Sequence, residues 1–102
     1  MIKARKLAKI MKALSNENRL ALYLEIAKQK ESNFEAPRCN VSHIVKMFRL
    51  TAPTISHHLK ELVNADLITT EKQGRYLVAR INMETLAMVT KTLSGIENKW
   101  ER

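Results

Sequence analysis

The chain has 102 residues, of which 45% are hydrophobic, two are glycine and two are proline. This length is sufficient for one domain and excludes a separate catalytic module, and the composition is that of a helix-rich globular protein rather than a disordered one. Eighteen Lys and Arg residues against ten Asp and Glu residues give a net charge of +8, which favours a polyanionic partner such as nucleic acid or an anionic membrane surface.

The N-terminal stretch carries a concentrated positive charge. Residues 1–14 hold five basic side chains and no acidic one: Lys3, Arg5, Lys6, Lys9 and Lys12. They form either a solvated helix face or a surface that contacts phosphate directly.

No apolar run approaches the roughly 18 residues of a membrane span, and the basic residues interrupt any signal-peptide core, so we expect a cytoplasmic protein. Cys39 is the only cysteine, which excludes an intrachain disulfide and agrees with a reducing compartment.

The first half of the chain predicts three helices. Residues 2–14 form an amphipathic helix whose apolar side chains recur at helical spacing, namely Leu7, Ile10, Met11 and Leu14. Ser15 and Asn16 supply an N-cap for a second, largely buried helix. Residues 31–40 contain Pro37 and no periodicity, which indicates a loop, and a short helix follows at 41–48.

The second half predicts a helix, a hairpin and a closing helix. The helix at 52–65 has Thr51 as its N-cap and Pro53 in its first turn, where a missing N–H costs nothing. Residues 67–71 and 76–82 are rich enough in β-branched and aromatic side chains to be strands, and residues 72–75 form the turn, with Gly74 able to take a positive φ. Asn82 caps a last helix at 83–98.

Two short helices joined by a tight turn and followed by a hairpin with a basic tip indicate a winged helix-turn-helix. The expected fold is mainly α with a small β-hairpin, about five helices plus a two-stranded wing. We expect one DNA-binding domain over residues 1–102, with the helix-turn-helix at 41–65 and the wing at 67–82. This class of fold requires the second helix of the pair to enter a major groove wide enough for one α-helix.

The helix at 52–65 has one apolar and one polar side. With Ile55, Leu59 and Leu62 against the core, an advance of about 100° per residue directs the opposite side of the helix outward. That outer side and its flanks consist of Pro53, Thr54, Ser56, His57, Lys60 and Glu61. Taken alone these are ordinary exposed residues, but next to a wing they are typical of a surface that reads bases. The wing tip adds Lys72, Gln73 and Arg75, which are placed to reach phosphates or a neighbouring minor groove.

The run LTAPTISHHLKELVNADLITTEKQGRYLVARIN resembles the ArsR/SmtB family of winged-helix repressors, and KALSNENRLALYLEIA is similar to that family's preceding helix. The resemblance covers about residues 8–82. It implies a homodimer that sits on operator DNA and leaves it when an inducer binds. It also implies DNA contacts at the start of the recognition helix and in the wing. The residues in question are Thr51, Thr54, Ser56, His57, Lys60, Lys72, Gln73 and Arg75.

The metal sites of that family are not evident here. Where relatives carry a Cys-Val-Cys pair, this chain reads Asn40-Val41-Ser42, and residues 83–102 contain no His, Cys or Asp. We therefore expect no metal and no other cofactor, because zinc needs four ligands. Cys39 and His43 lie four apart and leave a metal or redox response open, but two ligands per chain make an incomplete site. The inducer remains unidentified.

The last helix carries a seam of apolar residues at spacings of three and four: Leu86, Val89, Leu93, Ile96 and Trp100. The seam packs either on the first helix of its own chain or against a second copy. We expect a homodimer built from the helices at 2–14 and 83–98, with Leu7, Ile10, Met11 and Leu14 in the same interface.

A two-fold dimer predicts a palindromic operator, so the chain is expected to be a sequence-specific repressor of duplex DNA. The alternative is a winged-helix module that binds other proteins. An enzyme is disfavoured, because no phosphate-binding glycine loop and no nucleophile–base pair is found.

Overall fold

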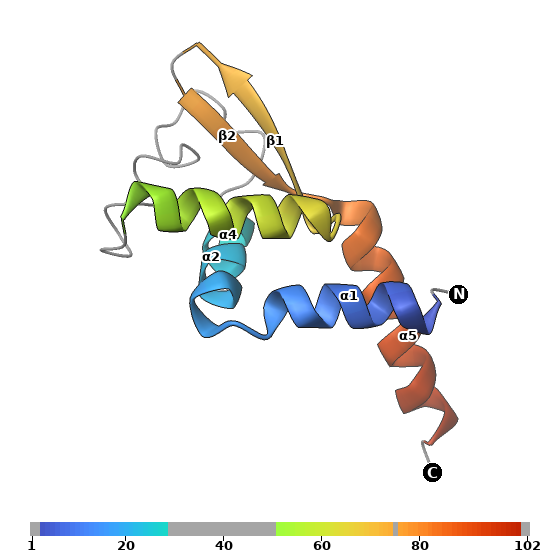
Figure 1. Ribbon diagram of the computed structural model, residues 1–102. Helices are drawn as coiled ribbons and strands as arrows, with labels where there is room; N and C mark the ends of the chain where they lie inside the picture. The colour runs from blue at the N-terminus through green and yellow to red at the C-terminus, as the bar shows by residue number, and fades with distance from the viewer. Residues whose placement is uncertain (1–2, 29–50, 75, 101–102) are drawn as a thin grey trace.

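The computed structural model describes residues 3–28, 51–74 and 76–100, which form four helices and a two-stranded hairpin (Figure 1). The helices are α1 (Ala4–Leu14), α2 (Glu17–Lys28), α4 (Ala52–Asn64) and α5 (Met83–Lys99), and the strands are β1 (Ile68–Gln73) and β2 (Tyr76–Ile81). The expected mainly helical fold with a hairpin is confirmed for these ranges. The helix expected at 41–48 and the loop expected at 31–40 lie outside them.

Three helices begin at the residues that the sequence indicated. Asn16 accepts a hydrogen bond from the backbone N–H of Arg19 at 3.0 Å, and Thr51 accepts one from the N–H of Thr54 at 3.3 Å. Asn82 accepts from two N–H groups of the first turn of α5. Each side-chain oxygen satisfies a donor that the helix itself leaves unpaired, which is why Asn and Thr are favoured at these positions. The predicted caps are confirmed.

The core lies between α1, α2, α4 and the base of the hairpin. The predicted stripe of α4 is buried, with Ile55, Leu59 and Leu62 exposed by 0%, 4% and 0% of their surface. These side chains belong to one cluster with residues of α1, α2, the turn after α4 and both strands: Ile10, Ala13, Leu22, Tyr23, Ile26, Ala65, Leu67, Ile68 and Ala79. Burying a side chain the size of leucine or isoleucine contributes about 1.5–3 kcal/mol. The stripe therefore fixes which side of α4 faces solvent.

The turn from α4 into β1 is tighter than the sequence suggested. The N–H of Leu67 donates to the carbonyl of Leu62 and the N–H of Asp66 to that of Val63, both at 2.9 Å, which is the Schellman pattern of helix termination. Asp66 takes the left-handed conformation, with φ of 61°, at the position where glycine is usual. As a result β1 begins at Ile68, one residue later than predicted, and Leu67 belongs to the turn.

The hairpin is antiparallel and projects away from the helices (Figure 1). Its register pairs Ile68 with Ile81 at the base and Gln73 with Tyr76 at the tip. Only residues 74 and 75 connect the strands, and Gly74 has the predicted positive φ, at 62°. Lys72 and Gln73 therefore lie on β1 rather than in the turn.

Helix α5 leaves the body of the molecule along its second half (Figure 1). Thr85 is buried and Val89 is half-buried, whereas residues 93–100 are all exposed. One part of the expected dimer interface needs correction, since Ile10 is 1% exposed and already packs in the core of its own chain. In the described ranges, no helix combines the length and apolar character needed to cross a membrane.

Candidate nucleic-acid interface

The exposed side of α4 carries the central group of predicted site residues. Ser56, His57 and Lys60 are all exposed, on the side of the helix away from the buried stripe. These side chains offer hydroxyl, imidazole and ammonium groups, so the surface presents both donors and acceptors of hydrogen bonds. A single helix with one buried and one polar side has the shape and chemistry required to enter a major groove.

The start of α4 combines a cap with two exposed hydroxyl groups. The hydroxyl of Thr51 accepts from the backbone of Thr54, and the two side-chain oxygens lie 2.8 Å apart, in a hydrogen bond for which either can be the donor. Pro53 occupies the first turn and has no N–H to satisfy. Thr51 is thus partly engaged in holding the helix end. Its hydroxyl has a structural role in addition to the predicted one.

The wing tip holds the second group of predicted residues. Lys72 is exposed on β1, and Gln73 is half-buried, with its amide donating to Glu71 at 3.4 Å. Glu71 also receives a hydrogen bond from Arg80 at 2.6 Å, so these two opposite charges are neutralised on the wing. Arg75 lies outside the described residues. Of the predicted tip residues that are described, Lys72 is the one that presents a full positive charge.

A shallow groove of about 270 Å³ separates α4 from the wing. Its lining consists of Ser56, Leu59, Lys60, Val63, Thr70 and Leu77. Val63 and Leu77 are 36% and 37% exposed, which leaves apolar surface beside the polar side of α4. The sequence analysis did not find this groove, because the angle between the wing and the helix is set by tertiary packing.

His58 has a different role from its neighbour His57. It is 6% exposed, and its Nδ1 accepts a hydrogen bond from Nε of Arg19 at 3.4 Å. Burial lowers the pKa of His58, and the positive charges of Arg19 and His57 lower this pKa further. The two imidazole rings are tilted by 48° with centroids 6.0 Å apart. His58 therefore packs inside the protein, whereas His57 faces solvent.

Arg19 joins three helices and was not identified as important from the sequence. From α2 its guanidinium donates to the carbonyl of Ala13 in α1 at 3.1 Å and to His58 in α4. The signal for it in the sequence is indirect: Arg19 lies in the segment KALSNENRLALYLEIA, which is similar to a helix of ArsR/SmtB proteins.

The described ranges contain no group of three or more His, Cys, Asp or Glu side chains arranged to hold a metal ion. Cys39 and His43, whose spacing left a metal response open, lie outside those ranges. The candidate interface consists of the polar and basic side chains of α4 and the wing.

Comparisons with known proteins point to one group of regulators. Residues 34–70 match the model of the family described as bacterial regulatory protein, arsR family. The chain is 33% identical over 92 residues to an arsenical resistance operon repressor of Staphylococcus xylosus, which covers 90% of this chain and 81% of that protein. It is 31% identical over 98 residues to a repressor of the same description from Staphylococcus aureus, covering 96% and 86%.

Solved structures show the same fold. An ArsR-like transcriptional regulator from Rhodococcus superposes with a TM-score of 0.74 at 24% identity, over 94% of this chain and 83% of that one. The homodimeric winged helix-turn-helix DNA-binding domain of a Mycobacterium bovis protein superposes with a TM-score of 0.68 at 20% identity, over 96% and 83%. These similarities confirm the winged helix-turn-helix architecture.

Proposed function

The chain belongs to the ArsR family of bacterial regulatory proteins, and from that premise we propose that it is a repressor that binds operator DNA sequence-specifically as a homodimer. Membership places it among transcriptional regulators rather than enzymes. The two staphylococcal relatives are described as repressors of arsenical resistance operons. Because bacterial DNA lies in the cytoplasm, the proposed site of action is the cytoplasm.

One observation carries the proposal: the polar side of α4 is exposed while its apolar side is fully anchored. Ser56, His57 and Lys60 face solvent, and Ile55 and Leu62 have no exposed surface. A helix that reads bases must keep a fixed orientation, because a rotation of one residue redirects every side chain by about 100°. The burial of the opposite side provides that orientation.

We assign the contacts by position. Ser56 and His57 are proposed to contact the edges of bases, and Lys60 is proposed to contact a guanine or a phosphate. Thr51 and Thr54 are proposed to contact the DNA backbone next to the start of α4. The wing residues Lys72, Gln73 and Arg75 are proposed to contact phosphates or the adjacent minor groove.

The proposed dimer uses the exposed apolar side of α5. Leu93, Ile96 and Trp100 are 45%, 55% and 77% exposed, on a helix whose second half has little cover from its own chain. Met11 of α1 is 40% exposed and extends the same proposed interface. A two-fold axis through these helices would place two α4 helices about one turn of DNA apart, hence the expectation of a palindromic operator.

The test starts from a selection of binding sites out of random duplexes with the purified protein. The proposal predicts an enriched inverted repeat and a sequence-selective shift at moderate salt. His57→Ala should then weaken binding to the selected site by about 1–3 kcal/mol per half-site and relax the preference at one position. Lys72→Ala should weaken binding to all DNA sequences by the same factor. It should also reduce the slope of log affinity against log salt concentration by about one.

Lys91→Ala is the matched control, because Lys91 is an exposed lysine on α5, opposite the apolar seam. If no sequence is enriched while the protein remains folded, the alternative of a protein-binding winged helix is favoured. If His57→Ala retains the full affinity for the selected site and the full sequence preference, the assignment of the polar side of α4 to base recognition is wrong.

A further inference from the structure

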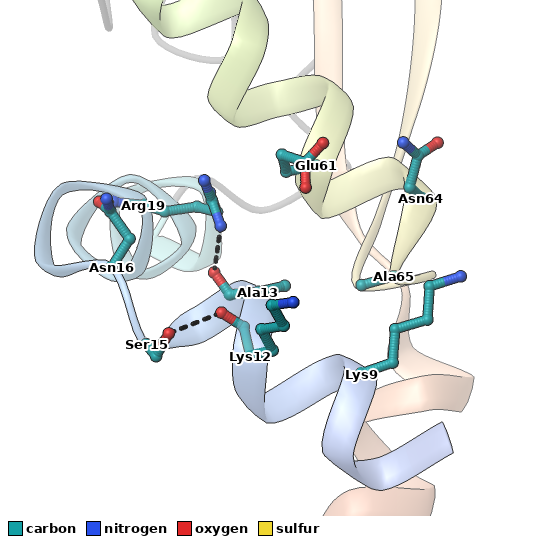
Figure 2. Close-up of a pocket in the computed structure, with 9 residues that line it drawn as sticks. All are labelled: Lys9, Lys12, Ala13, Ser15, Asn16, Arg19, Glu61, Asn64 and Ala65. Atoms are coloured by element: carbon teal, nitrogen blue, oxygen red, sulfur yellow. Dashed lines mark hydrogen bonds between the residues drawn. The ribbon is translucent and has the colours of Figure 1, made fainter. Parts of the chain in front are cut away.

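A basic hollow lies on the opposite flank of α4 from the wing. It is bounded by α1, the start of α2 and the second half of α4, and its volume is about 510 Å³ (Figure 2). Pockets for small molecules fall in the range of about 300–1,000 Å³. None of the residues assigned above to DNA contacts on α4 and the wing lines it. Lys9 and Lys12 do belong to the basic N-terminal group for which phosphate contact was one of two alternatives, so the test below must separate an anion from DNA.

The charge of the hollow is strongly one-sided. Three cationic side chains line it, Lys9, Lys12 and Arg19, against a single carboxylate, Glu61. In the described ranges, ion pairs are formed by Lys28 with Glu25 and by Arg80 with Glu71, and neither lysine of the hollow has such a partner. Positive groups that share a concave wall repel one another and together attract an anion.

Arg19 offers donors that are already held in place. An arginine has five N–H groups. Two of them are used inside the protein, on the carbonyl of Ala13 and on Nδ1 of His58, and these bonds fix the plane of the guanidinium. Figure 2 shows Arg19 and Ala13 on the α1–α2 side of the hollow, with Glu61 opposite them on α4. Three N–H groups of Arg19 remain for a ligand, at little further cost in side-chain entropy.

We propose that this hollow binds a small hydroxylated anion with at least two negative charges, carried by carboxylate or phosphate groups, and that the anion acts as an effector of DNA binding. The cations pair with the anionic groups, and Glu61 and the amides of Asn16 and Asn64 pair with hydroxyl groups. A DNA backbone fits less well, because it is repelled by Glu61 and has no hydroxyl to offer it.

Two features connect the hollow to DNA binding. Arg19 contacts His58, which immediately precedes the buried Leu59 and follows the exposed His57 on α4. A ligand bound to the remaining N–H groups of Arg19 therefore changes how firmly the guanidinium holds His58 and, with it, the α4 helix. On α1, Lys9 points about 160° away from Leu7 and Met11, so an anion in the hollow leaves the proposed dimer face free. This coupling rests on the proposed function, whereas binding of the anion does not.

Binding is tested first without DNA. Citrate, glucose 6-phosphate and inorganic phosphate are titrated calorimetrically into the full chain at constant ionic strength, in buffer freed of metals by a chelating resin so that no competing polyanion is added. We expect at least one hydroxylated anion to bind with a stoichiometry of one per chain, more tightly than inorganic phosphate. Lys12→Gln should weaken this binding about tenfold, since it removes one charge-assisted hydrogen bond. Lys91→Gln, which removes an exposed lysine outside the hollow, should change it less than twofold.

Coupling is tested next by fluorescence anisotropy with a selected operator duplex. The bound anion should change operator affinity at least about fivefold in the wild type, and less than twofold in Lys12→Gln. Lys12→Gln without anion should bind the operator as the wild type does.

The outcomes separate the two proposals. Absence of any selected operator contradicts the proposed function, while calorimetric binding lost in Lys12→Gln still supports the anion site. An intact operator affinity with no binding of any of the three anions overturns the anion site. A loss of DNA affinity in Lys12→Gln without anion also overturns it and assigns the hollow to the DNA backbone instead.

Discussion

Arg19 is the side chain whose removal tests the internal support of the recognition helix most directly. From α2 it donates to Ala13 of α1 at 3.1 Å and to His58 of α4 at 3.4 Å. Arg19→Met keeps a long apolar stem and removes both hydrogen bonds. The variant leaves Nδ1 of His58, a residue only 6% exposed, without its donor.

The expected loss of unfolding free energy is about 2 kcal/mol at pH 8. The bond to Ala13 contributes about 1–1.5 kcal/mol, and the longer bond to His58 about 0.5–1 kcal/mol, including the cost of an unpaired buried acceptor. For a domain of this size, 2 kcal/mol corresponds to a decrease in Tm of about 10 °C.

The pH dependence of this loss distinguishes the His58 contact from a general loss of packing. In the folded protein the pKa of His58 is below its usual 6.5, because burial and then the charges of Arg19 and His57 disfavour the imidazolium. The unfolded chain therefore binds more protons just below pH 6.5, and stability falls as the pH decreases through that window. Arg19→Met removes one cause of the lowered pKa, so its own stability falls less on acidification. The difference between wild type and variant should thus be smaller at pH 5 than at pH 8.

Urea denaturation followed by circular dichroism at pH 8, 7, 6 and 5 measures this difference, at one fixed protein concentration because a dimer unfolds in a concentration-dependent way. Lys9→Met is the control, since it removes a cation from the same region without touching His58 and should keep the pH dependence of the wild type. A destabilisation by Arg19→Met that is constant or larger at pH 5 would refute the reasoning.

Three further predictions follow from single elements. Asp66→Val should lower the unfolding free energy by about 1–2 kcal/mol, because a β-branched residue is strained at φ of 61°, whereas Asp66→Gly should stay within about 1 kcal/mol of the wild type in urea melts. Thr51→Ala should lower the unfolding free energy by about 1 kcal/mol, because the N–H of Thr54 loses its acceptor, and Thr51→Ser should retain most of the wild-type stability. Equal stability of the two variants would contradict the capping role of Thr51. Ile96→Glu should shift the protein from dimer to monomer in sedimentation equilibrium, with Lys91→Glu as the exposed control on the same helix, and an unchanged mass would exclude this side of α5 from the interface.

The sequence predicted those features that depend on local pattern. The spacing of Ile55, Leu59 and Leu62 is enough to place one side of α4 in the core, because a helix repeats every 3.6 residues whatever it packs against. Thr51 and Asn82 were identifiable as caps since their side chains bond to N–H groups only two or three residues away.

Features that depend on contacts distant in sequence were missed or assigned wrongly. Arg19 and His58 are 39 residues apart, and nothing in either segment specifies the other. Ile10 has the periodicity of an interface residue, but periodicity does not tell which neighbour covers it, and the core of its own chain does. Asp66 replaces the glycine that normally marks a Schellman turn, so the left-handed turn after α4 carried no recognisable signal, although the end of the helix was predicted within one residue.

The exposed C-terminal half of α5 links the stability of this helix to the proposed dimer. Residues 93–100 are all exposed in the described structure, although they include Leu93, Ile96 and Trp100. Burying its apolar side chains against another surface would lower their free energy, so this end of α5 gains from apolar contacts outside its own chain. In the proposed dimer a second copy would supply them symmetrically, and the same contacts would then set the distance between the two α4 helices. We infer that substitutions at this end of α5 change the distance between the two α4 helices of the dimer more readily than they destabilise the core. The core residues Leu22 and Ile26 and the apolar side of α4 are buried without contacts from residues 93–100.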